Sequence, residues 1–244
     1  MSPMMTIAKR EFRSYFDSPL AYVVICLTFF LLGLAIFMVG GFWKIDRASL
    51  HQLFQYMPLG LAVLIVPVVT MRSMAEERRS GTLEMLITLP VKDSDVILGK
   101  YLGALGLVLI LVLATALYPI MMFWFPWNLG PLDMGPMWSG YVGLVLFSST
   151  AVAIGLLVSS HTDSQSIAFF ITFFVLLVLW YIGSLAEYVN KEWLANALMY
   201  VSFQSRLEGF SRGLIDTRDV VFFLTVMALA LVISFRALER RRWV

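Results

Sequence analysis

The stretch YLGALGLVLILVLATALYPIMMFW, residues 101–124, decides the fold of this chain. It contains no Asp, Glu, Lys, Arg or His side chain. A helix rises by about 1.5 Å per residue, so one of this length can cross a hydrocarbon core about 30 Å thick. The stretch therefore predicts a transmembrane helix.

The rest of the chain repeats this apolar pattern. Hydrophobic residues make up 60% of the 244 positions and charged residues 14%, whereas soluble domains have about 45–50% and about 25%. Five further apolar blocks can cross most of a bilayer, at residues 20–41, 54–71, 138–159, 166–185 and 220–235. Residues 1–244 are therefore predicted to form one all-α integral membrane domain with six transmembrane helices, the second of them kinked at Pro67.

The basic residues predict the orientation of these helices. Lys and Arg in short flanking segments are retained on the cytoplasmic side. If both termini lie inside, the inner segments hold twelve basic residues and the outer segments six. We therefore expect a multi-pass protein of the cytoplasmic (inner) membrane with both termini in the cytoplasm. The net charge of +2 is too small to indicate a nucleic-acid partner.

The sequence does not indicate catalytic chemistry. Away from their ends, the six predicted spans contain no Asp, Glu, Lys, Arg or His, which disfavours a proton- or ion-coupled carrier. His51 and His161 fall in connections on opposite sides of the membrane, so they cannot share a metal ion or form a dyad. The chain has one cysteine, Cys26, and no phosphate-binding loop of the Gly-x-x-x-x-Gly-Lys type. We predict no catalytic, metal or nucleotide site in this chain.

Residues 1–19 precede the first span and predict an amphipathic helix. The apolar side chains recur at helical spacing, at Met5, Ala8, Phe12, Tyr15 and Phe16. The polar side consists of Lys9, Arg10, Arg13 and Ser14. We expect this helix to lie on the inner leaflet of the lipid bilayer, until Ser18 and Pro19 turn the chain into the membrane. The alternative is a disordered basic leader.

The region 72–100 holds the densest charge cluster, in the sequence RSMAEERRSGTLEMLITLPVKDSD at 72–95. We expect a first helix that continues the second span through Arg79 and is interrupted at Ser80 and Gly81. A second, amphipathic helix should follow and end before Pro90. A short charged helix held between two spans is suited to dock into a soluble partner. The alternative is a solvated loop of the kind that any span leaving the membrane carries.

Three motifs together resemble those of the ABC-2 type transporter permeases. The first motif resembles the coupling-helix region of that family. It reads Glu76-Glu77-Arg78-x-x-Gly81-Thr82-Leu83-Glu84 and is followed by Gly99-Lys100. The elbow helix of the family, particularly in the gliding-motility-associated branch, resembles the order Lys9-Arg10-Glu11-Phe12-x-x-Tyr15-Phe16-x-Ser18-Pro19. The region before its last span resembles the order Phe210-x-Arg212-Gly213-x-Ile215-Asp216-x-Arg218-Asp219.

The resemblance implies a permease subunit that pairs with a second permease, the same chain or a relative, around a path through the membrane. Separate cytoplasmic ATPase subunits would bind ATP and magnesium, so this chain would hold no cofactor and would not be an enzyme. The residues implied to face the ATPase are Glu76, Glu77, Arg78, Arg79, Gly81, Thr82, Leu83 and Glu84. A lesser inner contact is implied at Thr162, Asp163 and Ser164. The implied elbow helix includes Lys9, Arg10, Glu11, Phe12 and Arg13.

Residues 186–219 form a connection that is long for a helical bundle. It is amphipathic around Trp193, Ala197, Tyr200 and Val201. The resemblance implies short re-entrant or outer helices here, in a region that includes Phe210, Arg212, Gly213, Asp216, Arg218 and Asp219. The alternative is an inert surface loop.

The expected function is ATP-driven export or conformational work across the membrane. The alternative is a membrane component of a motility or assembly machine that uses the same ATPase without moving a solute, with an auxiliary extracytoplasmic subunit as a further partner. A path lined by uncharged residues suits a lipid, an amphiphile or a glycan, but no residue is identified as binding it. The Gly99-x-x-x-Gly103 face permits close helix packing without specifying whether the partner is a second copy or a relative.

Overall fold

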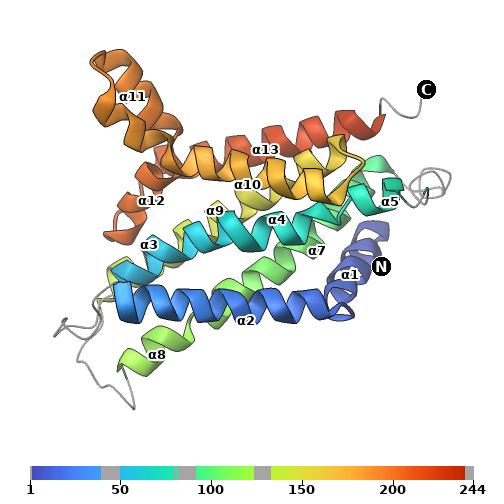
Figure 1. Ribbon diagram of the computed structural model, residues 1–244, viewed down its shortest axis with the longest axis horizontal. Coiled ribbons are helices and arrows are strands. Elements are labelled where there is room, and N and C mark those ends of the chain that lie inside the picture. The colour runs from blue at the N-terminus through green and yellow to red at the C-terminus, as the bar shows by residue number, and fades with distance from the viewer. Residues whose placement is uncertain (1, 40–49, 80, 82–91, 124–132, 240–244) are drawn as a thin grey trace.

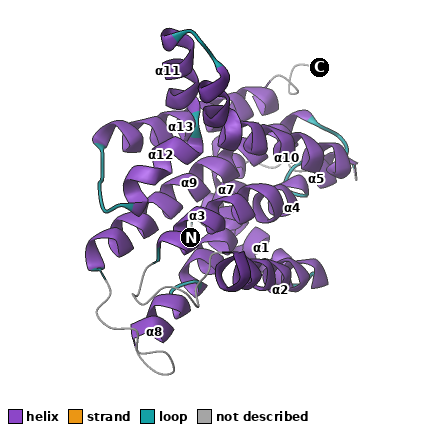
Figure 2. Ribbon diagram, turned by 60° about the vertical axis from the view of Figure 1, so that its left-hand side comes forward, coloured by secondary structure: helices purple, strands orange, loops and turns teal. Residues whose placement is uncertain are grey.

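The computed structural model describes residues 2–39, 50–79, 81, 92–123 and 133–239 of the chain. Helices and short connections make up all of this part, and Figure 2 shows no strand among the described residues. The all-α class predicted from the sequence is therefore confirmed for the part of the chain that the structure describes.

Five helical stretches are long and apolar enough to cross a membrane: His51–Arg78, Asp93–Met121, Met134–His161, Gln165–Tyr188 and Thr217–Glu239. They correspond to the last five of the six predicted spans, and each begins earlier than its apolar block because the helix continues into flanking polar residues. The elements within them are α3 (His51–Gly60), η3 (Leu61–Ile65), α4 (Val66–Met71), α5 (Ala75–Arg79), α7 (Asp93–Ala114), α8 (Leu117–Phe123), α9 (Met134–His161), α10 (Gln165–Tyr181), η4 (Ile182–Tyr188) and α13 (Thr217–Glu239).

The beginning of the chain forms two helices that meet at a bend. α1 (Pro3–Phe16) is followed by α2 (Pro19–Leu34), which continues into a π-helical turn, η1 (Ala35–Val39). α1 and the segment from Ala21 to Leu34 meet at an angle of 70°. Only when the two are taken together are they long and apolar enough to count as a membrane span. The predicted turn at Ser18 and Pro19 is confirmed, whereas a sixth crossing at residues 20–41 stays a prediction.

The long helices lie side by side, and their ends form two distinct ends of the molecule (Figure 1). α1, α5 and the C-terminal end of α13 lie at one end, together with the N-terminus. α8 and the two short helices before α13 lie at the opposite end. α1 and the last turn of α13 therefore lie at the same end of the described part of the molecule.

α9 is the central helix of the bundle. It packs against α13, α12, α7, α4 and α10. Small side chains allow this close approach, and Gly155 lies so near Thr70 that an added Cβ would be 2.3 Å from the threonine Oγ1. By contrast, only 22% of the most apolar window of Gln165–Tyr188 and 17% of that of Thr217–Glu239 is buried within the chain. The remaining apolar surface of these two helices suits lipid or another membrane helix as its neighbour.

The second predicted span contains a π-helical turn between its two prolines. Pro58 lies inside α3, and Pro67 is one of the first two residues of α4. Between them, in η3, the N–H of Val66 donates to the carbonyl of Leu61, five residues back. Pro67 has no N–H to donate, so the regular helical bonding pattern cannot continue through it. The kink expected at Pro67 thus takes the form of a π turn.

Two short helices occupy the predicted outer region: α11 (Glu192–Val201) and α12 (Phe203–Ser211). α11 contains no buried residue, whereas α12 buries Phe203 and Phe210. α12 ends in a Schellman motif, in which Gly213 has φ +94° and the N–H of Leu214 donates to the carbonyl of Gly209. The predicted helices are present, and Gly213 is required where the backbone adopts a positive φ.

Candidate functional site

The candidate site is the junction between α4 and α5, where the helix is interrupted at residues 72–74. The N–H of Ser73 donates to the carbonyl of Thr70, three residues back, rather than to that of Val69. The hydroxyl of Tyr15, from α1, donates to the Val69 carbonyl at 3.1 Å. Burial raises the pKa of Tyr15 far above its usual range, so the phenol stays protonated and able to donate.

Two further helices bond the other backbone groups of this junction. Ser159 Oγ, from α9, accepts hydrogen bonds from the N–H groups of Met74 at 3.1 Å and Ala75 at 3.2 Å. Lys100 Nζ, from α7, donates to the carbonyl of Ser73 at 2.6 Å. Side chains from three different helices therefore satisfy the groups that the interruption leaves without helical partners. The interruption is a built feature of the fold.

A buried group of charges joins α5 to α1 and α7. Lys100 Nζ lies 2.5 Å from Glu11 Oε1 and 2.8 Å from Glu77 Oε1, and its side chain is only 1% exposed. Arg10 Nη2 lies 3.5 Å from the same oxygen of Glu77. These four residues, which we call the Lys100 cluster, contain two acids and two bases. Lys100, Glu11 and Glu77 are largely buried and lie in contact as ion pairs, whereas the Arg10 side chain is 59% exposed at the edge of the cluster.

Glycines on α7 allow α1 to approach closely enough to form this cluster. A Cβ at Gly103 would lie 2.7 Å from the Cβ of Glu11, and one at Gly99 would lie 2.8 Å from the Cβ of Ile7. Both distances are too short for ordinary packing, so α1 lies directly on the glycine face of α7. The Gly99-x-x-x-Gly103 face, for which the sequence left the partner open, is thus covered by α1 of the same chain.

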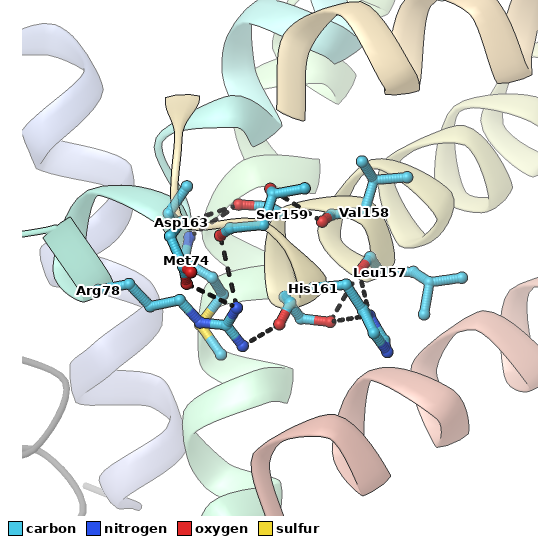
Figure 3. Close-up of polar contacts among 10 residues, drawn as sticks. Met74, Arg78, Leu157, Val158, Ser159, His161 and Asp163 are labelled. Atoms are coloured by element: carbon cyan, nitrogen blue, oxygen red, sulfur yellow. Dashed lines mark hydrogen bonds and ion pairs between the residues drawn. The ribbon is translucent and has the colours of Figure 1, made fainter. Parts of the chain in front are cut away.

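Arg78 anchors the opposite side of α5 to the end of α9 (Figure 3). Its guanidinium donates to the carbonyl of Ser160, to the carbonyl of Thr162 at 3.5 Å and to Asp163 Oδ1 at 3.3 Å. The Arg78 side chain is 3% exposed, whereas that of Asp163 is 77% exposed. The structure thereby brings together Arg78 and the 162–164 turn, two sites that the sequence predicted separately. Ser164 is the N-cap residue of α10.

α5 therefore bridges two groups of helices. Glu77 binds the α1 and α7 side, and its neighbour Arg78 binds the α9 and α10 side. The sequence predicts that the second span continues as one helix through Arg79, whereas the turn at 72–74 separates α5 from α4. Gly81 has φ +69°, a conformation that favours glycine. Of the other residues implied to face an ATPase, Glu76 is exposed. The side chain of Arg79 and all of Thr82, Leu83 and Glu84, with the second predicted helix, lie outside the described residues.

Comparison with known families identifies the bundle that carries this junction. The sequence model of the family described as ABC-2 family transporter protein matches residues 46–237, which is well over half of the chain. This chain belongs to the ABC-2 transporter family. It is the membrane component of a transporter and is not itself catalytic. No match was found among the curated proteins.

The family match divides the ABC-2 junction into two parts. The matched region, residues 46–237, includes α5, Lys100, Ser159 and the 162–164 turn, whereas α1 and α2 precede it. The Lys100 cluster therefore connects the shared family region to the N-terminal helices of this chain. The resemblance to the gliding-motility-associated branch, which rested partly on residues 9–22, stays a prediction.

The other predicted site residues of the ABC-2 chain do not join the junction. Lys9 and Arg13 are exposed on α1, and Phe12 is half-buried near Gly106. The remaining predicted residues lie with α12 and the start of α13, at the opposite end of the molecule in Figure 1. They are the buried Phe210, Arg212 paired with Glu208, Gly213 in the Schellman motif, Asp216 accepting from the N–H of Arg218, and Asp219 paired with Arg206.

Sequence reasoning missed the residue at the centre of the junction. Lys100 was assigned to the inner loop ahead of the third span, but it is a buried residue of α7. Glu11 carried a signal for it, because Ala8, Glu11 and Tyr15 fall on one face of α1 at spacings of three and four residues. A carboxylate among the apolar positions of an amphipathic helix requires a buried cation as its partner.

The ABC-2 bundle also contains a large apolar cavity, of about 770 Å³, between α7, α8 and α9. Its lining carries no charged side chain and includes Leu113, Ile120, Trp138 and Tyr141. It is separate from the junction, with which it shares no lining residue. Among the described residues, no group of three His, Cys, Asp or Glu side chains is placed to hold a metal ion.

Proposed function

We propose that this ABC-2 chain is the permease subunit of an ATP-driven exporter and that a separate ATPase acts on it through the segment that follows α5. The observation that carries this proposal is the fixing of α5 on both of its sides, by Lys100 and by Arg78. A segment of five residues would otherwise be too short to form a stable helix. Anchored in this way, it provides a base from which the predicted amphipathic helix at 82–90 contacts a partner.

The proposed contact is divided among the predicted residues. Glu76, exposed on α5, would face the ATPase together with Thr82, Leu83 and Glu84. Glu77 and Arg78, whose side chains are 18% and 3% exposed, would act from behind by holding α5 in place. The 162–164 turn, bonded to Arg78, would support the same surface.

We further propose six transmembrane crossings in the cytoplasmic membrane, with α2 as the first and both termini in the cytoplasm. The distribution of basic residues and the position of α1 and the end of α13 at one end of the molecule support this orientation. ATP and magnesium would be bound by the ATPase subunits. Two permeases, identical or related, would form the path, and the exposed apolar surfaces of α10 and α13 offer area for that contact.

The test is to tag the chain in its native membrane, extract it gently and identify the proteins that co-purify with it. We expect an ATPase with the wild type and its loss from Glu76→Arg combined with Glu84→Arg. Glu208→Arg with Glu187→Arg makes the same change of charge at exposed positions near the opposite end and should retain the ATPase. An ATPase that stays bound to the first double variant would contradict the proposed surface, and its absence from every sample would contradict the proposed function.

Glu77→Arg is a poor choice for this experiment. It would bring a third base next to Lys100 and Arg10, and the resulting repulsion would disturb α1 and α7 as well as any partner contact. Loss of the ATPase from that variant would not distinguish a broken interface from a displaced helix. Glu76 and Glu84 avoid this ambiguity.

A second candidate is a membrane component of a motility or assembly machine that performs mechanical work without moving a solute. The observation that favours it is α11, which buries none of its residues and exposes 69% of Trp193, as would suit an auxiliary extracytoplasmic subunit. Reconstitution of the permease and ATPase alone in liposomes separates the candidates. ATP-dependent flux of a lipid or amphiphile supports the exporter, whereas ATP hydrolysis that occurs only with a co-purified auxiliary subunit supports the machine.

A further inference from the structure

Lys100 connects parts of the chain that are far apart in sequence. Its ammonium group binds Glu11 on α1, Glu77 on α5 and the carbonyl of Ser73 at the junction. We propose that Lys100 is a positioning residue that couples α5 to α1, so that displacement of the segment after α5 moves α1 and, through it, α2. The importance of this coupling for transport rests on the proposed function, whereas the coupling itself does not.

The bonding capacity of Lys100 is the first argument. An ammonium group has three donors, and these three contacts use all of them. Lys100 is buried, so no bulk water is available to replace a contact that is lost. When α5 moves, Lys100 must either carry Glu11 with it or leave its site, and in both cases α1 responds.

The second argument is that the other polar contacts of α1 converge on the same junction. The Tyr15 hydroxyl donates to Val69 at the end of α4, and Arg10 pairs with Glu77 on α5. Directly after α1, Ser18 Oγ accepts a hydrogen bond from Arg72 Nη1 at 3.1 Å. Polar groups of α1 and the residues after it thus attach to the segment 69–77 as well as to Lys100 on α7, and a shift of this segment acts on α1 through them.

The third argument is that α1 determines the position of α2. The two helices are separated by two residues and bent by 70°. Much of α2 faces outward, including the exposed side chains of Tyr22, Val23 and Phe30. The inner face of α2 packs beside α3, and its first turn is fixed by the two-residue connection to α1. The contacts therefore run from α5 through Lys100 to α1 and then to the first apolar helix of the chain.

Hydrogen–deuterium exchange of the full chain in lipid nanodiscs, without any ATPase, tests this coupling. The measured quantity is the exchange of α1 amides, in peptides covering residues 3–16. All variants carry Arg10→Gln, which removes the direct ion pair between α1 and Glu77. In this background, Glu77→Gln should raise α1 exchange by about tenfold, because it removes one of the two charged contacts of Lys100 and with it the link between Glu11 on α1 and α5. The control is Glu187→Gln, which makes the same change of charge at an exposed glutamate remote from α1 and should have no effect.

A double-mutant cycle separates coupling from a general loss of structure. In a Lys100→Met background, Glu77→Gln should no longer raise α1 exchange and should lower it, because it removes the repulsion between Glu77 and Glu11. A further rise in α1 exchange in the double variant would overturn the proposal, as would unchanged α1 exchange in Glu77→Gln or an equal effect of Glu187→Gln. Independent structural contributions would be additive, so this readout responds to the coupling alone.

The reciprocal experiment keeps the proposal testable if Glu77→Gln fails to insert. Coupling between two sites is mutual, so Glu11→Gln on α1 should raise exchange in the peptide covering residues 74–79. Arg13→Gln, on the exposed side of α1, is its control. Equal exchange in these two variants would overturn the coupling. Because no ATPase is present, this result is independent of co-purification: either proposal can fail without the other.

Discussion

The two ends of this molecule use buried bases in different ways. At the junction end, Lys100 binds residues 89, 27 and 23 positions away in the sequence, on three separate elements. At the opposite end, Arg206 binds Asp219, 13 positions away, and the carbonyl of Tyr200, six positions away, and its guanidinium lies over the rings of Tyr200 and Phe222. The first base joins distant helices, and the second stabilises one local unit formed by α11, α12 and the start of α13.

Short helices show the same difference. α5 has five residues and is bound on two sides, whereas α11 has ten residues and buries none of them. Length and helix propensity would favour α11 as the more stable element. Tertiary contacts reverse this order at the junction. The comparison indicates that the chain fixes the end that precedes the proposed coupling segment and leaves the other end open to its surroundings.

The largest expected effect on stability comes from replacing the buried base at each end of the molecule, Lys100 or Arg206. Lys100→Met leaves the carboxylates of Glu11 and Glu77 facing each other in a buried site and should lower the free energy of unfolding by about 3–5 kcal/mol. Arg206→Met should cost less, about 1–3 kcal/mol, because Asp219 lies in the first turn of α13, where the helix dipole stabilises its charge. Unfolding in mixed micelles with increasing denaturant measures both values.

A compensating variant checks the cause of that loss. Replacing Glu11 and Glu77 with Met in the Lys100→Met chain removes the unpaired charges and should recover most of the stability. If the triple variant is as unstable as Lys100→Met, the loss arises from packing rather than from charge. Equal effects of Lys100→Met and Arg206→Met would remove the distinction between the two ends.

An intermediate effect is expected from the glycine face of α7. Gly103→Val should destabilise the chain by about 1–3 kcal/mol, because the added side chain meets Glu11 and the backbone of Ala8. Gly60→Ala is the matched control: no atom outside its own helix lies within 4 Å of the added Cβ, and alanine favours the helix by up to about 1 kcal/mol. Thermal unfolding in nanodiscs should shift in opposite directions for the two variants, and a shared direction would contradict the close approach of α1.

The smallest effect is expected from Tyr15→Phe, which removes one hydrogen bond to the Val69 carbonyl. We expect a loss of about 1 kcal/mol. The pKa of Tyr15 is raised by burial, so folding favours the neutral phenol; its contribution is complete below the unfolded pKa of about 10 and declines as the pH rises beyond that. The difference in the free energy of unfolding between wild type and Tyr15→Phe should therefore be the same at pH 7 and at pH 9. Replacing the exposed Tyr188 with Phe should leave the free energy of unfolding unchanged at both pH values. A difference that falls between these pH values would show that the phenol ionises.

Much of the fold follows from local properties of the sequence. Apolar blocks identified five spans that the structure contains, and the amphipathic pattern of residues 3–16 identified α1. The break after Arg79 followed from Gly81, which the structure places at a positive φ. Local reasoning was less accurate at helix ends, since helices such as Asp93–Ala114 include polar turns that hydropathy assigns to loops.

The site was predictable only in part, because its contacts join residues far apart in the sequence. Periodicity placed Glu77 and Arg78 on one short helix, but their partners Lys100 and Asp163 come from other elements. Adjacent residues on a helix do not face the same way, so a run of charged residues cannot all point to one partner. The direction of each side chain depends on tertiary packing, and the contact of this region with an ATPase stays a prediction.

The π-helical turn at Leu61–Ile65 determines how this chain tolerates insertions and deletions. A π turn contains one residue more than the α-helical turn that it replaces. The rest of α4 is therefore rotated about the helix axis relative to an uninterrupted α-helix, and this sets the direction in which the chain enters the 72–74 turn before α5. Loss of one residue from 61–65 would change the position of that turn, with its bonds to Tyr15, Ser159 and Lys100, without altering any charge. The number of residues in this turn is thus more tightly constrained than their identity.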